Sequence, residues 1–189
     1  MRLRLIPLIG FALPSLLFAH PHVFIDTYFT IEMTPRHLHS ASVTWIMDEM
    51  TSMSLLMDFD SDHNEKFDPA ETEALKADAF DHLQDQGYYL RLELDKKVLA
   101  PVPGRFWLEV ADHRVLYHFT VPMDYALDSV KTIRFGCVDP EYLVAMLLQQ
   151  DRIRVTDPQN PKRVIPYRVI QEEIDYTTMA ELVEIEVHP

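Results

Sequence analysis

The sequence predicts an α+β fold of mostly antiparallel β-strands, with an EF-hand-like helix–loop–helix inserted after the first hairpin. Three observations predict this fold. Apolar and polar residues alternate from His22 onward, a helical period replaces the alternation near Met50, and an acidic loop with calcium-ligand spacing separates two helix-forming stretches. With 189 residues, of which 48% are hydrophobic and 25% charged, the chain suits one globular domain.

Two strands are expected first, because apolar side chains recur at every second position along each of them. The turn between the strands lies at residues 33–36, where Pro35 presets φ. The second strand extends to about Met47. The residues expected to face the core are Val23, Ile25, Phe29, Ile31, Ala41, Val43, Trp45 and Met47.

The next segment is predicted to be helical in two parts. Residues 50–57 carry a stripe at helical spacing that is expected to pack in the core. Residues 69–86 are rich in helix formers, and Gly87 stands where a glycine would end the helix. The two apolar stripes consist of Met50, Met53, Leu56 and Met57, and of Leu75, Ala79, Phe80 and Leu83.

The remaining chain is predicted to form short strands, because β-branched and aromatic residues recur between Pro, Gly and Asp turns. The segment 141–150 suits either a strand or a helix. The predicted strands lie at about 88–95, 105–110, 115–121, 132–138, 152–156, 164–170 and 182–187.

The charge balance favours cations as ligands. The chain has 17 Lys and Arg residues against 30 Asp and Glu residues, a net charge of −13. Such an excess of acid repels phosphate backbones and anionic lipid, so we expect no nucleic-acid binding. The four glycines are widely separated, which excludes a dinucleotide fingerprint. Cys137 is the single cysteine, which excludes an internal disulfide and a cysteine-rich zinc site.

Residues 1–19 are predicted to be a signal peptide. Arg2 and Arg4 precede an apolar stretch, and Ala19 offers a small residue at the cleavage position. The alternative is a membrane anchor, but the apolar stretch contains two prolines and is shorter than the ~20 residues that a spanning helix needs. We therefore expect an exported protein with a single domain at 20–189 and no membrane span in the mature chain.

A transition-metal site is predicted at the start of the mature chain. Cleavage after Ala19 would leave His20 with a free amine and an imidazole, and His22 projects from the same strand face. A three-residue hairpin loop would place His22 opposite residue 46 or 48, which brings Asp48 and Glu49 close to it as carboxylate ligands. Asp26 is a candidate for orienting an imidazole. The alternative interpretation is a polar, exposed terminus.

A calcium loop is predicted at residues 60–71. Six of these residues occupy the ligand positions 1, 3, 5, 7, 9 and 12 of an EF-hand loop. Glu65 stands at position 6, where glycine is usual, and this replacement should weaken calcium binding. The alternative is a plain helix start, with an Asp N-cap, a proline and a capping-box Glu. The candidate ligands are Asp60, Asp62, Asn64, Lys66 through its carbonyl, Asp68 and Glu71.

Several of these motifs together resemble a known family. The motifs are HPHVFID at residues 20–26, VTWIMDE at 43–49, the Asp/Asn loop with Pro-Ala-Glu, GYY at 87–89 and DPEY at 139–142. The chain resembles uncharacterised periplasmic proteins that are labelled a periplasmic component of an ABC-type transport system. Such proteins are associated with nickel/cobalt-type permeases, and some with zinc uptake. The resemblance implies a periplasmic location and a metal-handling accessory role.

We therefore expect a non-enzymatic periplasmic protein that delivers zinc, or nickel or cobalt, to a membrane permease of nickel/cobalt type. Two other functions remain open. An N-terminal histidine that ligates through both amine and imidazole resembles the brace of secreted copper enzymes. The loop at 60–71 alone would make the protein a calcium-stabilised structural module.

Overall fold

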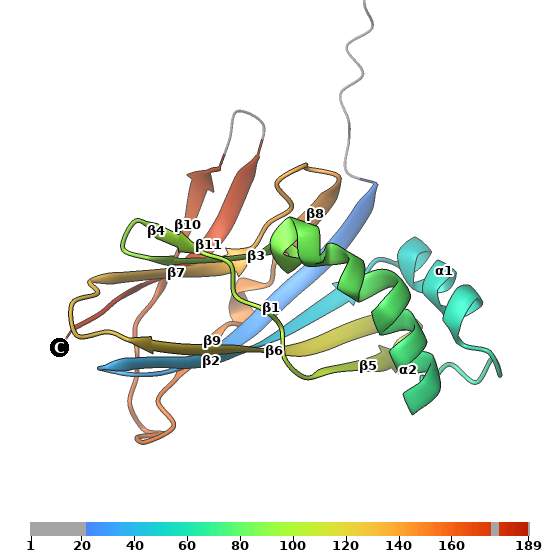
Figure 1. The fold of residues 1–189 in the computed structure, drawn as a ribbon, viewed down its shortest axis with the longest axis horizontal. Coiled ribbons are helices and arrows are strands. Elements are labelled where there is room, and N and C mark those ends of the chain that lie inside the picture. Colours follow the sequence, from blue (N-terminus) through green and yellow to red (C-terminus); the bar gives the residue numbers. More distant parts are fainter. Residues whose placement is uncertain (1–21, 175–177, 189) are drawn as a thin grey trace, which may run out of the picture.

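Two β-sheets and a helical segment form the protein, seen here in a computed structural model that describes residues 22–174 and 178–188 (Figure 1). The six-stranded sheet has the order β5-β6-β2-β1-β8, and β9 also pairs with β1. Its pairs are antiparallel except that β8 and β9 run parallel to β1. Its strands are β1 (Val23–Thr34), β2 (His37–Met47), β5 (Phe106–Ala111), β6 (Arg114–Ala126), β8 (Val144–Leu148) and β9 (Arg154–Thr156).

The second sheet is entirely antiparallel, with the order β10-β11-β7-β3-β4. Its strands are β3 (Leu90–Leu94), β4 (Lys97–Leu99), β7 (Thr132–Cys137), β10 (Arg168–Glu173) and β11 (Met179–Glu186). Most of them match the predicted segments, but β4 was not predicted. It is a short edge strand with two exposed residues, so it carries no alternation that the sequence could reveal. The mostly antiparallel α+β fold is thus confirmed.

The helical segment follows the first hairpin, as predicted. It contains α1 (Glu49–Phe59), α2 (Pro69–Leu75), a π-helical turn η1 (Lys76–Phe80) and a 3₁₀ segment η2 (Asp81–Tyr89). The stretch expected to be one helix therefore changes its helix type twice. Gly87 has φ 62°, the left-handed conformation that suits glycine where a helix ends. A last 3₁₀ turn, η3 (Gln150–Arg152), lies between β8 and β9.

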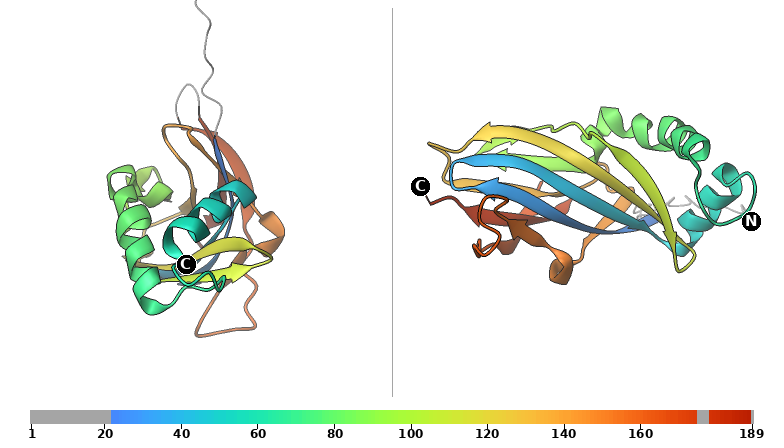
Figure 2. Two further views of the ribbon diagram at one scale, coloured as in Figure 1. Left: turned by 90° about the vertical axis from the view of Figure 1, so that its right-hand side faces the viewer. Right: turned by 90° about the horizontal axis from the view of Figure 1, so that it is seen from below.

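The core lies on the inner face of the six-stranded sheet, which two different layers cover. Phe29 on β1 meets Phe135 on β7 edge to face at 4.9 Å between ring centroids, which joins the two sheets. Phe80 of η1 lies 5.1 Å from Phe119 and 6.0 Å from Trp45, so the helical segment covers the rest of the face. Figure 1 shows the second sheet on the left and the helices on the right. The right-hand view of Figure 2 shows the helices beside one end of the six-stranded sheet.

Helix α1 does not bury its methionines, which corrects the prediction from their spacing. Met50, Met53 and Met57 are 73%, 59% and 72% exposed. The face that α1 turns to the core instead carries Ser52, which is buried, with Leu55, Leu56 and Phe59 packed against the core cluster. That set also has helical spacing, and burial by the neighbouring elements selects it over the methionines.

Among the described residues, no helix is long and apolar enough to cross a membrane.

Candidate cation-binding site

The candidate site is the loop that connects α1 to α2. Asp60 is the C-cap of α1, and its backbone N–H donates to the Leu56 carbonyl. Asp68 is the N-cap of α2, where its carboxylate accepts from Ala70 and Glu71 N–H at 2.7 and 2.9 Å. The Glu71 carboxylate accepts in return from the Asp68 N–H at 3.0 Å, which completes a capping box. Both ends of the loop are therefore held by helix termini.

Three carboxylates converge across this loop. Asp60, Asp62 and Glu71 each offer one oxygen, and these oxygens lie within 4.8 Å of one another. Asp60 is 3% exposed and Glu71 is 8% exposed, whereas Asp62 faces solvent. The three residues occupy positions 1, 3 and 12 of the predicted loop. Folding thus brings together the two ends of the motif.

The other predicted ligands lie differently. Asn64 donates its side-chain amide to an Asp62 oxygen at 2.7 Å, so its amide nitrogen faces the acidic cluster. Lys66 is exposed in the loop. The Asp68 carboxylate turns to the N–H groups of α2 and is not part of the three-carboxylate cluster. The converging set is therefore smaller than the predicted one.

Hydrogen bonds from loop residues stabilise the charged form of the Glu71 carboxylate. The Ser61 hydroxyl and N–H both donate to the same Glu71 oxygen, at 2.6 and 2.8 Å. The Ser61 hydroxyl, together with the Asp68 and Ser61 N–H groups, lowers the pKa of Glu71 below its ordinary value. Glu71 is therefore an anion at neutral pH and can act as a cation ligand. Ser61 was not among the predicted site residues, because serine at position 2 of such a loop carries no motif signal.

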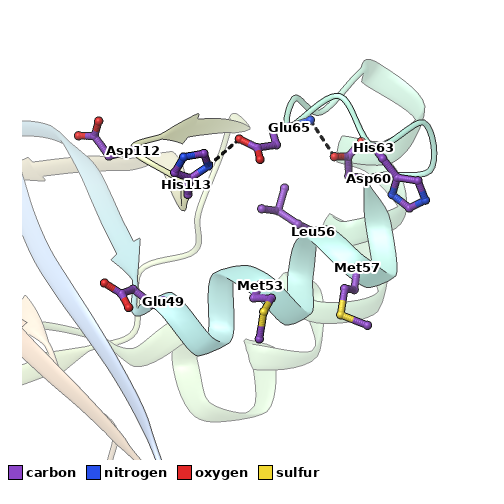
Figure 3. Close-up of a pocket in the computed structure, with 9 residues that line it drawn as sticks. All are labelled: Glu49, Met53, Leu56, Met57, Asp60, His63, Glu65, Asp112 and His113. Carbon is purple, nitrogen blue, oxygen red and sulfur yellow. Dashed lines mark hydrogen bonds and ion pairs between the residues drawn. The ribbon is translucent and has the colours of Figure 1, made fainter.

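Glu65 lies in the left-handed region, as its place in the motif predicts. Its φ is 57°, and its N–H donates to an Asp60 carboxylate oxygen at 2.9 Å. Its side chain is hydrogen-bonded to His113 Nδ1 at 2.8 Å, which connects the loop to the turn between β5 and β6 (Figure 3). No sequence pattern indicates this contact between residues 48 positions apart.

Only part of the predicted transition-metal site lies within the described residues. His20 lies outside the described residues, together with the predicted signal peptide. His22 is exposed, and its N–H donates to the Leu143 carbonyl at 3.0 Å. Glu49, the first residue of α1, is also exposed.

The predicted hairpin register is wrong. The loop has two residues, because Thr34 pairs with His37, and a register shift follows between Glu32 and Met33. Asp48 consequently lies opposite Phe24 and not opposite His22, with the Asp48 N–H donating to the Phe24 carbonyl at 3.0 Å. A change of loop length shifts the whole pairing, and the apolar alternation does not specify that length.

The carboxylates predicted beside the histidines have partners of their own. Asp48 accepts from the Phe24 N–H at 2.8 Å and from the Thr51 N–H at 2.7 Å, as the N-cap of α1. Burial would raise the pKa of Asp48, but these hydrogen bonds outweigh it and lower the pKa. Asp26 accepts from Gln149 at 2.9 Å and pairs with Arg114 at 3.3 Å. Its carboxylate is thus bound to these two side chains.

Comparison with known proteins identifies the family. Residues 5–171 match the model of a family described as a protein of unknown function, DUF1007. The chain belongs to this family.

Curated relatives of this DUF1007 protein have no assigned function. A Spirochaeta aurantia protein, named an uncharacterized 15.5 kDa protein in the trpE 3′ region, is 33% identical over 107 residues, which cover 54% of this chain and 76% of the relative. An uncharacterized protein of Haemophilus influenzae is 27% identical over 143 residues, or 74% of this chain and 68% of that protein. No solved structure matches the chain. The resemblance to an uncharacterised family is confirmed.

Proposed function

We propose that this DUF1007 protein is a periplasmic cation-binding protein and that the loop from Asp60 to Glu71 is a calcium site. The convergence of Asp60, Asp62 and Glu71 within 4.8 Å supports the proposal. Calcium accepts six to eight oxygens at about 2.4 Å, so its ligand oxygens lie within a few ångströms of one another. A capped helix start requires Asp68 and Glu71, but it requires neither Asp60 nor Asp62.

A cation in this loop would stabilise the folded protein. Two of the carboxylates are buried beside each other, and their mutual repulsion is relieved when a cation binds between them. The loop also connects α1 to α2, whose Leu75 is fully buried in the core. Because a ligand that binds only the folded state stabilises that state, calcium should raise the melting temperature.

Thermal unfolding with and without calcium tests the site. In Glu71→Gln, the melting temperature should no longer rise with calcium, because the ligand at position 12 loses its charge. Glu73→Gln is the matched control, since Glu73 is an exposed residue of the same helix and should leave the calcium response unchanged. If Glu71→Gln retains the full response, the loop is a capped turn without a cation.

A second candidate function is the delivery of zinc, or of nickel or cobalt, to a membrane permease of nickel/cobalt type. The two contacts between Asp48 and Phe24 favour it, because they hold the start of β1 against the start of α1. His22 lies two residues before Phe24 and Glu49 directly follows Asp48, so these contacts connect the two segments that carry an exposed imidazole and an exposed carboxylate. His20 would complete this site, with its amine if cleavage follows Ala19.

Zinc calorimetry on the mature chain tests this second site. His22→Ala should weaken zinc binding at least tenfold, and one alanine added before His20 should do the same if the amine is a ligand. His188→Ala, at an exposed histidine elsewhere, is the control. Zinc affinity should also fall as the pH is lowered, because imidazole must be neutral to bind metal. Equal affinity at pH 7.5 and 5.5 would exclude histidine ligation.

A further inference from the structure

The exposed side of α1 carries three thioethers. Met50, Met53 and Met57 each expose more than half of their surface. Among the described methionines, Met179 is the one other with comparable exposure, at 57%. Burial therefore does not explain why methionine occupies these positions. Residues three and four apart are neighbours on a helix surface, which places Met53 next to Met50 on one side and Met57 on the other.

Two of these methionines line a cleft of about 540 Å³ together with two histidines. Figure 3 shows Met53 and Met57 projecting from the same side of α1. The His63 ring lies beyond the C-terminal end of α1, which is the end nearer to Met57. His63 is exposed, and its N–H donates to the Asp60 carbonyl at 3.4 Å, which fixes its place in the first turn of the loop. His113, the second histidine, pairs with Glu65. The lining residues are Glu49, Met53, Leu56, Met57, Asp60, His63, Glu65, Asp112 and His113.

The thioether and imidazole groups that line the cleft differ in chemistry from the carboxylates of the neighbouring loop. Thioether sulfur is a soft, uncharged donor that prefers Cu(I) to calcium or magnesium, and imidazole also binds copper. Methionine has three rotatable bonds, so two side chains one helical turn apart can bring their sulfur atoms to one ion. The acidic residues Glu49, Glu65 and Asp112 around the cleft raise the local concentration of any cation.

We propose that Met53, Met57 and His63 form a binding site for a soft monovalent cation, Cu(I) or its analogue Ag(I). The site lies on α1 and at the start of the loop, and it uses none of the three carboxylates assigned to calcium. Its three proposed ligands are also different from the histidines proposed for zinc, His20 and His22. The protein would then hold soft and hard cations on adjacent surfaces.

Competition for Cu(I) under reducing conditions, with bicinchoninate as the coloured competitor, tests the site. Met53→Leu/Met57→Leu and His63→Ala should each weaken Cu(I) binding at least tenfold. Leucine keeps the size and helix propensity of methionine, so the double variant should fold normally. Met179→Leu is the matched control and should leave the affinity unchanged. Unchanged affinity in the double variant, or a loss confined to His22→Ala, would overturn the proposal.

A second measurement locates the ion directly. Ag(I) is the redox-inert probe, and limited peroxide oxidation followed by peptide mass spectrometry reports sulfoxide formation at each methionine. Bound Ag(I) should slow the oxidation of Met53 and Met57 at least threefold and leave that of Met179 unchanged. Equal protection at all three residues, or at none, would contradict a site on α1.

Discussion

At the scale of single residues, Glu65 and His63 are the two positions of the candidate calcium loop with a left-handed backbone, each with φ 57°. At Glu65 this φ places a side chain where glycine is favoured, at a cost of about 1–2 kcal/mol. The hydrogen bond between Glu65 and His113 offsets little of this cost, because the His113 side chain is 82% exposed and water competes for the same groups. The loop therefore carries backbone strain at Glu65.

Replacing Glu65 with glycine should tighten calcium binding. The variant removes the left-handed penalty, and we expect about a tenfold gain in affinity, which corresponds to about 1.4 kcal/mol. The wild-type dissociation constant should be on the order of 10⁻⁴–10⁻³ M, as in extracellular calcium modules. Calorimetry with calcium measures both values. His113→Ala removes the hydrogen bond to Glu65 without relieving the backbone, and the calcium affinity of this variant should stay within about twofold of wild type.

At the scale of elements, Asp48 joins the first hairpin to α1. Its carboxylate caps the helix through the Thr51 N–H and also accepts from the Phe24 N–H of β1, at 2.7 and 2.8 Å. Beyond this cap, the buried Ser52 hydroxyl accepts from the Val115 N–H of β6 at 3.0 Å. The start of α1 is thereby fixed to two strands of the six-stranded sheet.

Removing the Asp48 carboxylate should destabilise the protein. Asp48→Ala loses the N-cap and leaves the Phe24 N–H without its acceptor, so we expect the free energy of unfolding to fall by about 1–2 kcal/mol. Urea denaturation measures the change. Asp58→Ala removes an exposed carboxylate from the same helix and should change the stability by less than about 0.5 kcal/mol. Equal effects of the two variants would show that the cap is not stabilising.

At the scale of the whole molecule, a network of charged side chains connects β7, β10 and β11 of the second sheet. Glu184 on β11 accepts from Arg134 of β7 and from Arg168 of β10, both at 2.7 Å. The Glu184 side chain is 4% exposed. Its burial would raise the pKa of the carboxyl, but the two arginines outweigh burial and lower it. Glu184 therefore stabilises the fold as an anion.

The stability that Glu184 contributes should depend on pH. Glu184→Gln should lower the free energy of unfolding by about 1–2 kcal/mol at pH 7, because two charge-assisted hydrogen bonds are lost. Because folding lowers the pKa of Glu184, its carboxylate stabilises the folded protein at pH values above the ordinary pKa of 4.5. This stabilisation is lost as the pH falls through the pKa of the folded state. The difference in melting temperature between variant and wild type should therefore shrink below pH 4.5. Glu186→Gln, at an exposed neighbour, should show no such trend.

Features that depend on local spacing follow from the sequence alone. Alternation along one chain segment shows which side chains share a face, and Ile25, Phe29, Val43 and Trp45 are buried as the pattern predicted. The Asp68–Glu71 capping box and the left-handed Glu65 also follow from a short motif. In each case the interacting groups lie within a few residues, so chain geometry alone places them.

Which of two possible helix faces is buried, and which distant residues meet, depends on tertiary packing. Helix α1 has two stripes at helical spacing, and packing against the core left the methionines exposed. Asp48 meets Phe24 because the hairpin turn has two residues and the pairing shifts once more, between Glu32 and Met33. Glu65 meets His113 because the β5–β6 turn lies beside the loop. Periodicity relates residues within one element, whereas these contacts depend on the placement of separate elements, which the shared core determines.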